Sequence, residues 1–396
     1  MQETLDLNCN NDDHLPLKGI RVLDFAQFLA GPVAAMRLAD LGADVIKIER
    51  PEVGDACRSL VINDQRIGEN SLLFHTFNRN KRSFAADLKS DTDLQDVKAL
   101  VRTADVVIHN FRPGIMEKLG LDFPSLKQIN PGLIYGAVSG YGNKGPWRQK
   151  PGQDLLAQCM SGMAWLSGDE PDGPVPIGFP LIDIATAGNL VQGILAVLLR
   201  KARTGQGGLV EVDLMSSAVD LQIEHLGAYL NGDRTLPRRS TIGNANVYGA
   251  APYGVYKLRG GYLAIAMTPL KQLEELLAIP ALGGFLQDKA FACRDEIKSL
   301  IAANLANRQL EEVLNALESA GVWCAKVMDW NEFTASAGFE ALSPTHTVVT
   351  SQGRELIATR APLRLDGKTL MTNKGAPELG ENTHELKAEL RLSSTG

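Results

Sequence analysis

Short apolar runs alternate with helix-like patterns along the first half of the chain. Two buried strands are predicted at residues 19–25 and 43–49, with a helix between them at 32–41. Pro32 suits the first turn of that helix, and Gly42 suits its C-terminal end. Strands that alternate with helices in this way predict βαβ units and a parallel sheet. The alternation continues with further helices and strands at residues 93–103, 105–109, 116–128 and 133–138.

One long apolar helix is predicted near the middle of the chain, at residues 184–203. Lys201 and Arg203 in its last turn, followed by Gly205, form a typical helix end. A further strand and helix are predicted at residues 208–214 and 216–231.

The polar, basic segment 232–243 interrupts the pattern, and we expect a domain linker there. Beyond it we predict a β-hairpin, three helices and a strand, at residues 254–266, 270–277, 296–305, 310–320 and 322–327. The chain is expected to be loop-rich from residue 331. The predicted fold class is therefore α/β, with a large Rossmann-like domain on a parallel sheet and a smaller α+β domain. The predicted divisions are a disordered N-terminal tail at 1–16, the large domain at 17–231, the small domain at 232–330 and a C-terminal segment at 331–396.

Composition narrows the classes of function. A net charge of −6 without a long basic run argues against nucleic-acid binding. Five scattered cysteines without a C-x-x-C pair favour a reducing compartment. The six histidines lack ligand-like spacing, so no metal site is expected. The polar N-terminus lacks a signal-peptide pattern, and the apolar segment 190–199 is too short to span a bilayer, so we expect a cytoplasmic protein with no membrane contact.

The glycine-rich segment Gly140-Tyr-Gly-Asn-Lys-Gly145 matches the spacing G-x-G-x-x-G and follows a predicted strand. A dinucleotide site also needs a helix that opens at these glycines, so that its N–H groups meet the pyrophosphate. Pro146 and Pro151 follow instead, so we predict a plain loop. The motifs of P-loop NTPases, zinc proteases and serine hydrolases are absent from the sequence.

A second motif, residues 110–114, follows the strand that ends at His109. Open α/β sheets bind ligands at the carboxyl ends of their strands. An aromatic ring, a free side-chain amide and a cation there would suit a flat base or a pantetheine arm, although a Pro-Gly turn explains the same residues. His109 itself is expected to be an ordinary, partly buried strand-end histidine.

Asp183 is a single carboxylate at the boundary between an apolar stretch and an apolar helix. Burying such a charge is costly unless it is used or satisfied. It suits the N-cap of the helix that begins near residue 184, where aspartate is favoured. The positive end of a helix favours an ionised carboxylate, and an ionised carboxylate is what nucleophilic catalysis requires. The helix cap and the nucleophile therefore both remain open on chemistry alone.

Many short segments, in order along the chain, resemble the family III CoA-transferases, the CaiB/BaiF group. The likeness is strong over residues 17–230 and looser beyond. The segments that carry it are residues 17–25, 30–32, 41–49, 80–83, 87–89, 104–107, 110–114, 130–131, 139–142, 158–162, 204–207 and 212–215.

The resemblance implies a function and a site. It implies a CoA-transferase in which Asp183 forms an acyl anhydride and then a CoA thioester, with CoA as a substrate and no tightly bound cofactor. It also implies an interlocked, ring-like homodimer, and a C-terminal segment that returns to the large domain. The positions implied to contact CoA are Gln27, Ala30, Arg50, Lys89, Asn110, Phe111 and Lys118.

Gln153 and Asp154 correspond to a pair of residues in the implied substrate pocket. Racemases related to this family carry a proton-transferring histidine at the first of these positions. Gln153 cannot exchange a proton near neutral pH, which disfavours epimerisation. The alternatives to a transferase are an α-methylacyl-CoA racemase and a non-catalytic protein that binds CoA or a nucleotide.

Overall fold

The structure is a computed structural model that describes residues 15–370 and 372–393. Most of the predicted N-terminal tail, residues 1–14, lies outside this range. The described residues form two compact units. The first unit comprises the residues up to Asp154, Leu181–Ser217 and the residues from Ser343 onward, and the second comprises Leu155–Pro180 and Ala218–Leu342. Residues 155–180 and 218–231 thus fall in the second unit, whereas the sequence pattern assigned them to the large domain.

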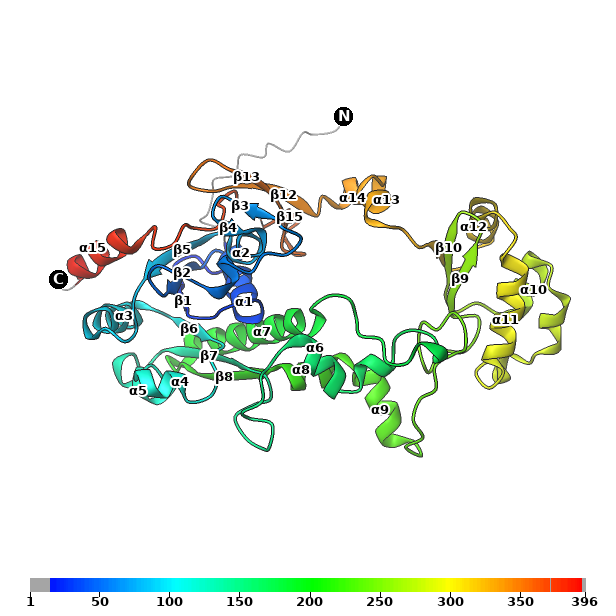
Figure 1. The fold of residues 1–396 in the computed structure, drawn as a ribbon, viewed down its shortest axis with the longest axis horizontal. Coiled ribbons are helices and arrows are strands. Elements are labelled where there is room, and N and C mark those ends of the chain that lie inside the picture. The colour runs from blue at the N-terminus through cyan, green and yellow to red at the C-terminus, as the bar shows by residue number, and fades with distance from the viewer. Residues whose placement is uncertain (1–14, 371, 394–396) are drawn as a thin grey trace. The chain divides into compact units, whose positions relative to one another are not determined.

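A six-stranded parallel sheet forms the centre of the first unit (Figure 1). Its order is β5-β2-β1-β6-β7-β8, in which the direction of winding reverses between β1 and β6. The α/β fold class with a parallel sheet is therefore confirmed. The strands are β1 (Arg21–Asp24), β2 (Asp44–Glu49), β5 (Lys81–Ala85), β6 (Val106–His109), β7 (Ile134–Ser139) and β8 (Gly208–Asp213).

Helices cover both faces of this sheet because successive side chains of each strand point to opposite faces. In β1, Val22 packs with α1 and α7, whereas Leu23 packs with residues of α3 and α15. The helices of this unit are α1 (Ala30–Asp40), α2 (Leu72–Asn78), α3 (Asp91–Thr103), α4 (Ile115–Leu119), α5 (Phe123–Ile129), α7 (Leu181–Thr204) and α15 (Thr383–Ser393). This unit also contains the small elements η2 (Ala56–Arg58), β3 (Arg66–Ile67), β4 (Asn70–Ser71), β14 (Arg364–Leu365) and β15 (Lys368–Thr369).

Helix α7 is longer than the segment on which the sequence argument about membranes rested. Among the described residues it is the one helix with the length and composition to cross a membrane, with a mean hydropathy of 1.7 over its most apolar window. The sequence argument considered only residues 190–199, which are one part of this helix. Leu190 and Ile194 on its buried face belong to the core formed with the sheet and α1, which is the packing of a core helix.

The second unit is built around a three-stranded antiparallel sheet in the order β11-β10-β9, of which Figure 1 shows β9 and β10 in yellow-green. Its core consists of the inward side chains of these strands and one face of each of α10, α11 and α12. The predicted hairpin and helices occur within a few residues of their expected bounds. The elements are β9 (Gly254–Leu258), β10 (Gly261–Ile265), α10 (Leu270–Leu277), η5 (Pro280–Gly284), η6 (Gln287–Lys289), α11 (Arg294–Leu305), α12 (Leu310–Ser319) and β11 (Cys324–Lys326).

The remaining elements lie before and after this sheet in the chain. Helices α6 (Asp154–Met160) and α8 (Leu214–Leu221) begin in the first unit and continue into the second. The expected loop-rich segment after residue 331 is more regular than predicted, because three helices and two pairs of antiparallel strands form there. The elements are η3 (Met163–Trp165), η4 (Glu170–Asp172), α9 (Ile223–Asn231), α13 (Trp330–Thr334), α14 (Ala337–Leu342), β12 (Thr345–Val349) and β13 (Glu355–Thr359).

Candidate active site

The turn between β1 and α1 lies at the point where the sheet reverses its direction of winding. Strand β1 pairs with β2 on one side and β6 on the other. The Gln27 amide donates to Asn110 Oδ1 at 2.8 Å, and Asn110 Nδ2 donates to the Gln27 carbonyl at 2.6 Å. The structure thus brings together Gln27 and Asn110, two of the predicted CoA contacts that lie far apart in sequence. This is the position at which open α/β sheets bind their ligands.

The side-chain amide of Asn110 is not free, which corrects the expectation from the sequence. Both of its polar atoms are used by the backbone of Gln27, so Asn110 shapes the turn. Phe111 is half-buried and stacks on His109 with ring centroids 6.3 Å apart. His109 ends β6 and is buried, as expected, and burial lowers its pKa to about 4. Phe111 and His109 line a cavity of about 420 Å³ at the carboxyl ends of β6, β7 and β8.

Close packing explains the glycine at the start of α1. A Cβ atom on Gly31 would lie 2.2 Å from the Ala26 Cβ and 3.8 Å from the Asn110 Cβ. Only glycine therefore lets the helix begin so near the turn. Ala30, another predicted CoA contact, is the buried first residue of α1. Within the described residues, Leu29 provides no side-chain cap for this helix.

The predicted phosphate-binding cations follow strands β2, β5 and β6, all at the carboxyl edge of the sheet. Arg50 comes directly after β2, Lys89 lies between β5 and α3, and Lys118 is on α4 after β6. All three are exposed. Strands β5, β2, β1 and β6 are adjacent, so they cover about 14 Å of the edge at a strand spacing of ~4.8 Å. The arrangement can accommodate an extended polyanion across the turn.

Asp183 lies in the first turn of α7, two residues after the helix begins at Leu181. The sequence prediction that Asp183 is the N-cap was therefore wrong. The residue is half-buried, and burial, with the nearby carboxylate of Asp154, raises its pKa to about 7. The expected preference for the ionised form is reversed, because desolvation and like charge outweigh the helix dipole. At neutral pH both protonation states of Asp183 are populated.

Asp154 performs the helix-capping role that was predicted for Asp183. Its Oδ1 accepts hydrogen bonds from the amides of Ile182 at 2.7 Å and Asp183 at 3.0 Å. Asp154 is buried, whereas its neighbour Gln153 is exposed. The structure therefore brings Asp154 and Asp183 together, although they are 29 residues apart in sequence. The hydrogen bond from the Asp183 amide to Asp154 fixes the backbone that carries the Asp183 side chain.

Two glycines attach the segment that carries Asp154 to the end of β7. A Cβ atom on Gly140 would lie 2.5 Å from the Gly152 Cα, so the two backbones touch. The G-x-G-x-x-G segment that starts at Gly140 forms a loop, and the next helix begins only at Asp154. The prediction of a plain loop is confirmed. The close approach of the two backbones explains why residue 140 is a glycine.

Topology places Asp183 at the same edge of the sheet as Gln27. Helix α7 leads into β8, and Gly208 at the start of β8 pairs with Ile134 at the start of β7. The C-terminus of α7 therefore lies at the amino edge of the sheet and its N-terminus at the carboxyl edge. The turn of Gln27 follows β1, which is parallel to these strands, so it lies at the carboxyl edge too. The carboxylate of Asp183 and the turn of Gln27 thus share one edge of the sheet.

A buried ionic cluster beneath the turn was missed by the sequence analysis. It consists of Asp24, Lys47, Asp55 and Lys81, each at most 2% exposed. Burial opposes ionisation of Asp24, but the two lysines hold its pKa below the ordinary value. Burial lowers the pKa of Lys81 to about 8, whereas the flanking carboxylates raise that of Lys47. The signal in the sequence was Lys47 between Ile46 and Ile48 in the strand at residues 44–49.

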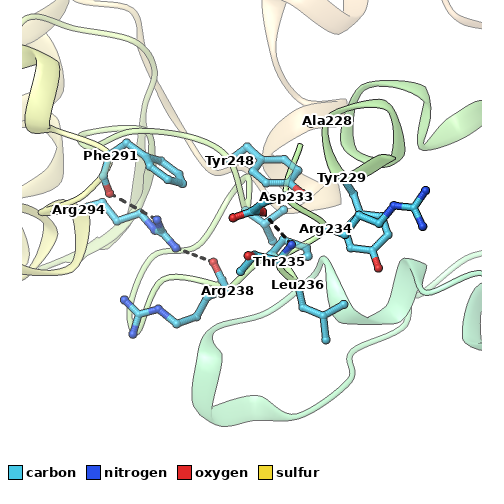
Figure 2. A pocket seen from close by; sticks show the side chains of 12 residues that line it. Ala228, Tyr229, Asp233, Arg234, Thr235, Leu236, Arg238, Tyr248, Phe291 and Arg294 are labelled. Carbon is cyan, nitrogen blue, oxygen red and sulfur yellow. Dashed lines mark hydrogen bonds between the residues drawn. The ribbon is translucent and has the colours of Figure 1, made fainter. Parts of the chain in front are cut away.

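The second unit contains a cavity of about 330 Å³, shown in Figure 2. Two of the three arginines that line it already have partners. Arg238 pairs with Asp295, and Arg294 donates to the carbonyls of Arg238 and Phe291. Both arginines thus bind other groups of the second unit. The motifs found in the sequence do not include the residues that line this cavity, so we do not regard it as the candidate active site. Across residues 15–370 and 372–393, the side chains also form no group able to hold a metal ion.

Known proteins are similar to this chain over most of its length. A sequence model described as CoA-transferase family III matches residues 17–383. A succinate–glutarate CoA-transferase of Agrobacterium fabrum is 34% identical over 95% of this chain and 96% of its own length. A succinyl-CoA:glutarate CoA-transferase of Mus musculus is 33% identical over 78% of this chain and 72% of its own. The crystal structure of a CaiB/BaiF family protein from Brucella suis matches with a TM-score of 0.80 at 32% identity, covering 95% of this chain and 99% of that one.

Proposed function

The chain belongs to CoA-transferase family III, and we propose that it moves CoA between an acyl-CoA and a carboxylic acid with Asp183 as the nucleophile. CoA transfer from an acyl-CoA to an acid is the activity of this enzyme. The proposed role of Asp183 is supported by its position. It lies half-buried beside Asp154 in the first turn of α7, at the carboxyl edge of the sheet.

The proposed reaction begins with Asp183 in its ionised form. The carboxylate attacks the carbonyl carbon of the donor thioester, CoA thiolate leaves, and a mixed anhydride of Asp183 and the acyl group forms. The thiolate then attacks the aspartyl carbonyl carbon, which frees the donor acid and leaves an aspartyl-CoA thioester. The acceptor carboxylate attacks the carbonyl carbon of this thioester, CoA thiolate leaves, and a second anhydride forms. Thiolate attacks the acyl carbon of that anhydride, releases the new acyl-CoA and restores Asp183.

The environment of Asp183 suits this chemistry. A carboxylate with few water neighbours is a stronger nucleophile than a fully solvated one, and a pKa near 7 keeps a large fraction ionised at neutral pH. Asp154 holds the amides of the first turn, so the nucleophile is presented from a rigid helix end. Rigid placement of a reacting group reduces the entropy lost in the transition state.

CoA acts as a substrate in this scheme, and no tightly bound cofactor is required. We assign its phosphates to the exposed cations Arg50, Lys89 and Lys118, which follow strands β2, β5 and β6. The turn of Gln27 and Ala30 lies between them and carries the pantetheine arm toward Asp183. Phe111 follows Asn110, which holds the turn, and its ring supplies an apolar surface beside the turn.

The relatives suggest the class of the two acids. Both curated relatives described above are named for succinate or succinyl-CoA and for glutarate. We therefore assign succinyl-CoA as the donor and a short dicarboxylic acid as the acceptor. Gln153 and Asp154 are assigned to the acid pocket. The racemase alternative is disfavoured because Gln153 supplies no base.

We propose that the enzyme is a homodimer. We also propose that it is located in the cytoplasm. Helix α9 carries exposed apolar side chains, of which Ile223 is 74% and Leu230 51% exposed. Side chains of this size are rarely left in water when they lie on one short helix, so a second copy of the chain is a suitable cover. Size-exclusion chromatography with light scattering tests this, and a monomeric mass at micromolar concentration would contradict it.

Trapping of the covalent intermediate tests the proposed function. The enzyme is incubated with succinyl-CoA and quenched with hydroxylamine, which converts an aspartyl anhydride or thioester to a hydroxamate. We expect the modified peptide to contain Asp183, and we expect no modification in Asp183→Asn. A panel of carboxylic acids with succinyl-CoA as donor then identifies the acceptor. Full turnover by Asp183→Ala would refute the mechanism, and α-proton exchange in D₂O without transfer would support the racemase.

A further inference from the structure

We propose that the buried cluster of Asp24, Lys47, Asp55 and Lys81 is a positioning device that holds the turn at residues 26–32 in its CoA-binding conformation. The proposal rests on the proposed function, in which this turn contacts CoA. It assigns a role to four buried charges that take no part in the chemical steps at Asp183.

Each charge of the cluster contacts the backbone of the turn. Asp24 Oδ1 accepts from the Ala26 amide at 2.9 Å, and Lys47 Nζ donates to the Ala26 carbonyl at 2.7 Å. Asp55 Oδ1 accepts from the Phe28 amide at 3.2 Å. Lys81 Nζ donates to the Pro32 carbonyl at 2.9 Å. With Asn110 on Gln27, five side chains from separate parts of the chain determine the path of one short turn.

The charges also hold one another in place. Lys47 Nζ lies 2.8 Å from Asp55 Oδ2, and Lys81 Nζ lies 2.8 Å from Asp24 Oδ2. Lys81 donates in addition to Asn78 Oδ1 at 2.8 Å. Two positive and two negative side chains therefore satisfy one another inside the protein, where an unpaired charge would be costly. Such a cluster has few alternative arrangements, so the backbone groups bound to it are rigid as well.

The turn needs this restraint because its middle is strained. Phe28 has a φ of +64°, in the left-handed region that favours glycine, and its side chain is 50% exposed. An exposed side chain gains little from packing, so the strain is not repaid by burial of its ring. The amide of Phe28 is held by Asp55, which in turn is held by Lys47. A turn held in one conformation before CoA binds loses less entropy on binding.

The test measures CoA binding without turnover. Isothermal titration calorimetry with free CoA, well below the Tm of each variant, compares Lys47→Met with the wild type. The matched control is Arg79→Met. Arg79 is also buried and pairs with Asp40 at 2.6 Å, but Asp40 lies at the far end of α1 from the turn. Both variants remove one buried cation, so both are expected to lower the Tm.

The two variants are expected to differ in affinity. Lys47→Met should raise the Kd for CoA at least tenfold and raise the KM for succinyl-CoA with it, while the KM for the acceptor acid changes less than twofold. Arg79→Met should leave the Kd for CoA within twofold of the wild type. Equal effects of the two variants on the Kd, or an unchanged Kd in Lys47→Met, would overturn the proposal.

A second pair of variants leaves the buried charges intact, in case Lys47→Met does not fold. Phe28→Val introduces a β-branched residue that resists a positive φ, whereas Phe28→Asn introduces one that tolerates it. We expect the Kd for CoA to rise at least fivefold in Phe28→Val and less than twofold in Phe28→Asn. Equal weakening in both would overturn the proposal, because the ring of Phe28 and not the backbone would then support binding. Retained turnover in Asp183→Ala would refute the catalytic scheme but leave these binding results unaffected.

Discussion

Replacing Asp183 by asparagine should stabilise the protein while it abolishes activity. Asparagine keeps the shape of the side chain and removes its charge. Burial and the Asp154 carboxylate raise the pKa of Asp183 from 3.8 to about 7, so ionisation of this group opposes folding. Residues whose surroundings are arranged for catalysis commonly reduce stability in this way.

The pH dependence follows from the sign of the shift. Between pH 3.8 and about 7 the folded protein binds more protons at Asp183 than the unfolded chain does. The free energy of unfolding therefore falls as pH rises through this window and is constant above it. The full shift corresponds to ~4 kcal/mol at ~1.4 kcal/mol per unit. Solvent that reaches the half-buried carboxylate reduces the effect, and we expect a gain of about 1–3 kcal/mol for Asp183→Asn at pH 8.

Urea unfolding between pH 5 and 8.5, followed by tryptophan fluorescence, provides the measurement. The difference in midpoint between Asp183→Asn and the wild type should grow with pH up to about 7 and then level off. Asp91→Asn is the matched control, since Asp91 is an exposed aspartate in the first turn of α3. That variant should lose about 0.3–1 kcal/mol of helix-dipole stabilisation, because Asp91 lies at the positive end of α3. A midpoint difference for Asp183→Asn that is independent of pH, or a loss of stability at every pH, would refute the reasoning.

Two further predictions concern the surroundings of Asp183, and a third concerns the packing of α7 on β8. Asp154→Asn keeps an acceptor for the amides of α7 but removes the like charge, so the acid limb of the kcat/KM profile should move to lower pH; an unmoved limb would contradict this. Gly152→Ala places a Cβ 2.6 Å from the Gly140 Cα and must shift the backbone beside Asp154, so kcat should fall at least tenfold in a steady-state assay. Gly193→Ala places a Cβ 2.5 Å from Val210 Cγ1 and should cost about 1–3 kcal/mol in urea unfolding, and Val210→Ala in the same chain should recover part of it.

Much of the fold was predictable because its signals are local. The hairpin and the helices of the second unit follow directly from period-2 and period-3.6 patterns, and α10 begins and ends at the predicted residues. Strand β5 was not predicted. It lies at the edge of the sheet and contains Lys81, Arg82 and Ser83, so it lacks the apolar run that identifies a strand. Its place depends on pairing with β2, which is not encoded within its own few residues.

The candidate site was only partly predictable. The resemblance to CoA-transferase family III is confirmed by the match over residues 17–383, and it singled out Asp183. The position at which α7 begins could not be predicted, and it determines the charge environment of Asp183. Because α7 begins at Leu181, Asp154 and not Asp183 caps the helix. The pattern of one chain segment cannot show that a carboxylate 29 residues earlier binds the same helix end.

The sequence by itself determined the fold class, most of the helices and strands, and the family to which the enzyme belongs. These follow from hydrophobic periodicity and from ordered motifs, and both signals lie within short, continuous segments of the chain. The tertiary structure decided which charges are buried together and what they hold. Asp24 and Lys81 are 57 residues apart, and Asn110 lies 83 residues from Gln27, yet Asp24, Lys81 and Asn110 all support the one turn that contains Gln27. A buried charge needs a partner, and only the folded chain determines which one it meets.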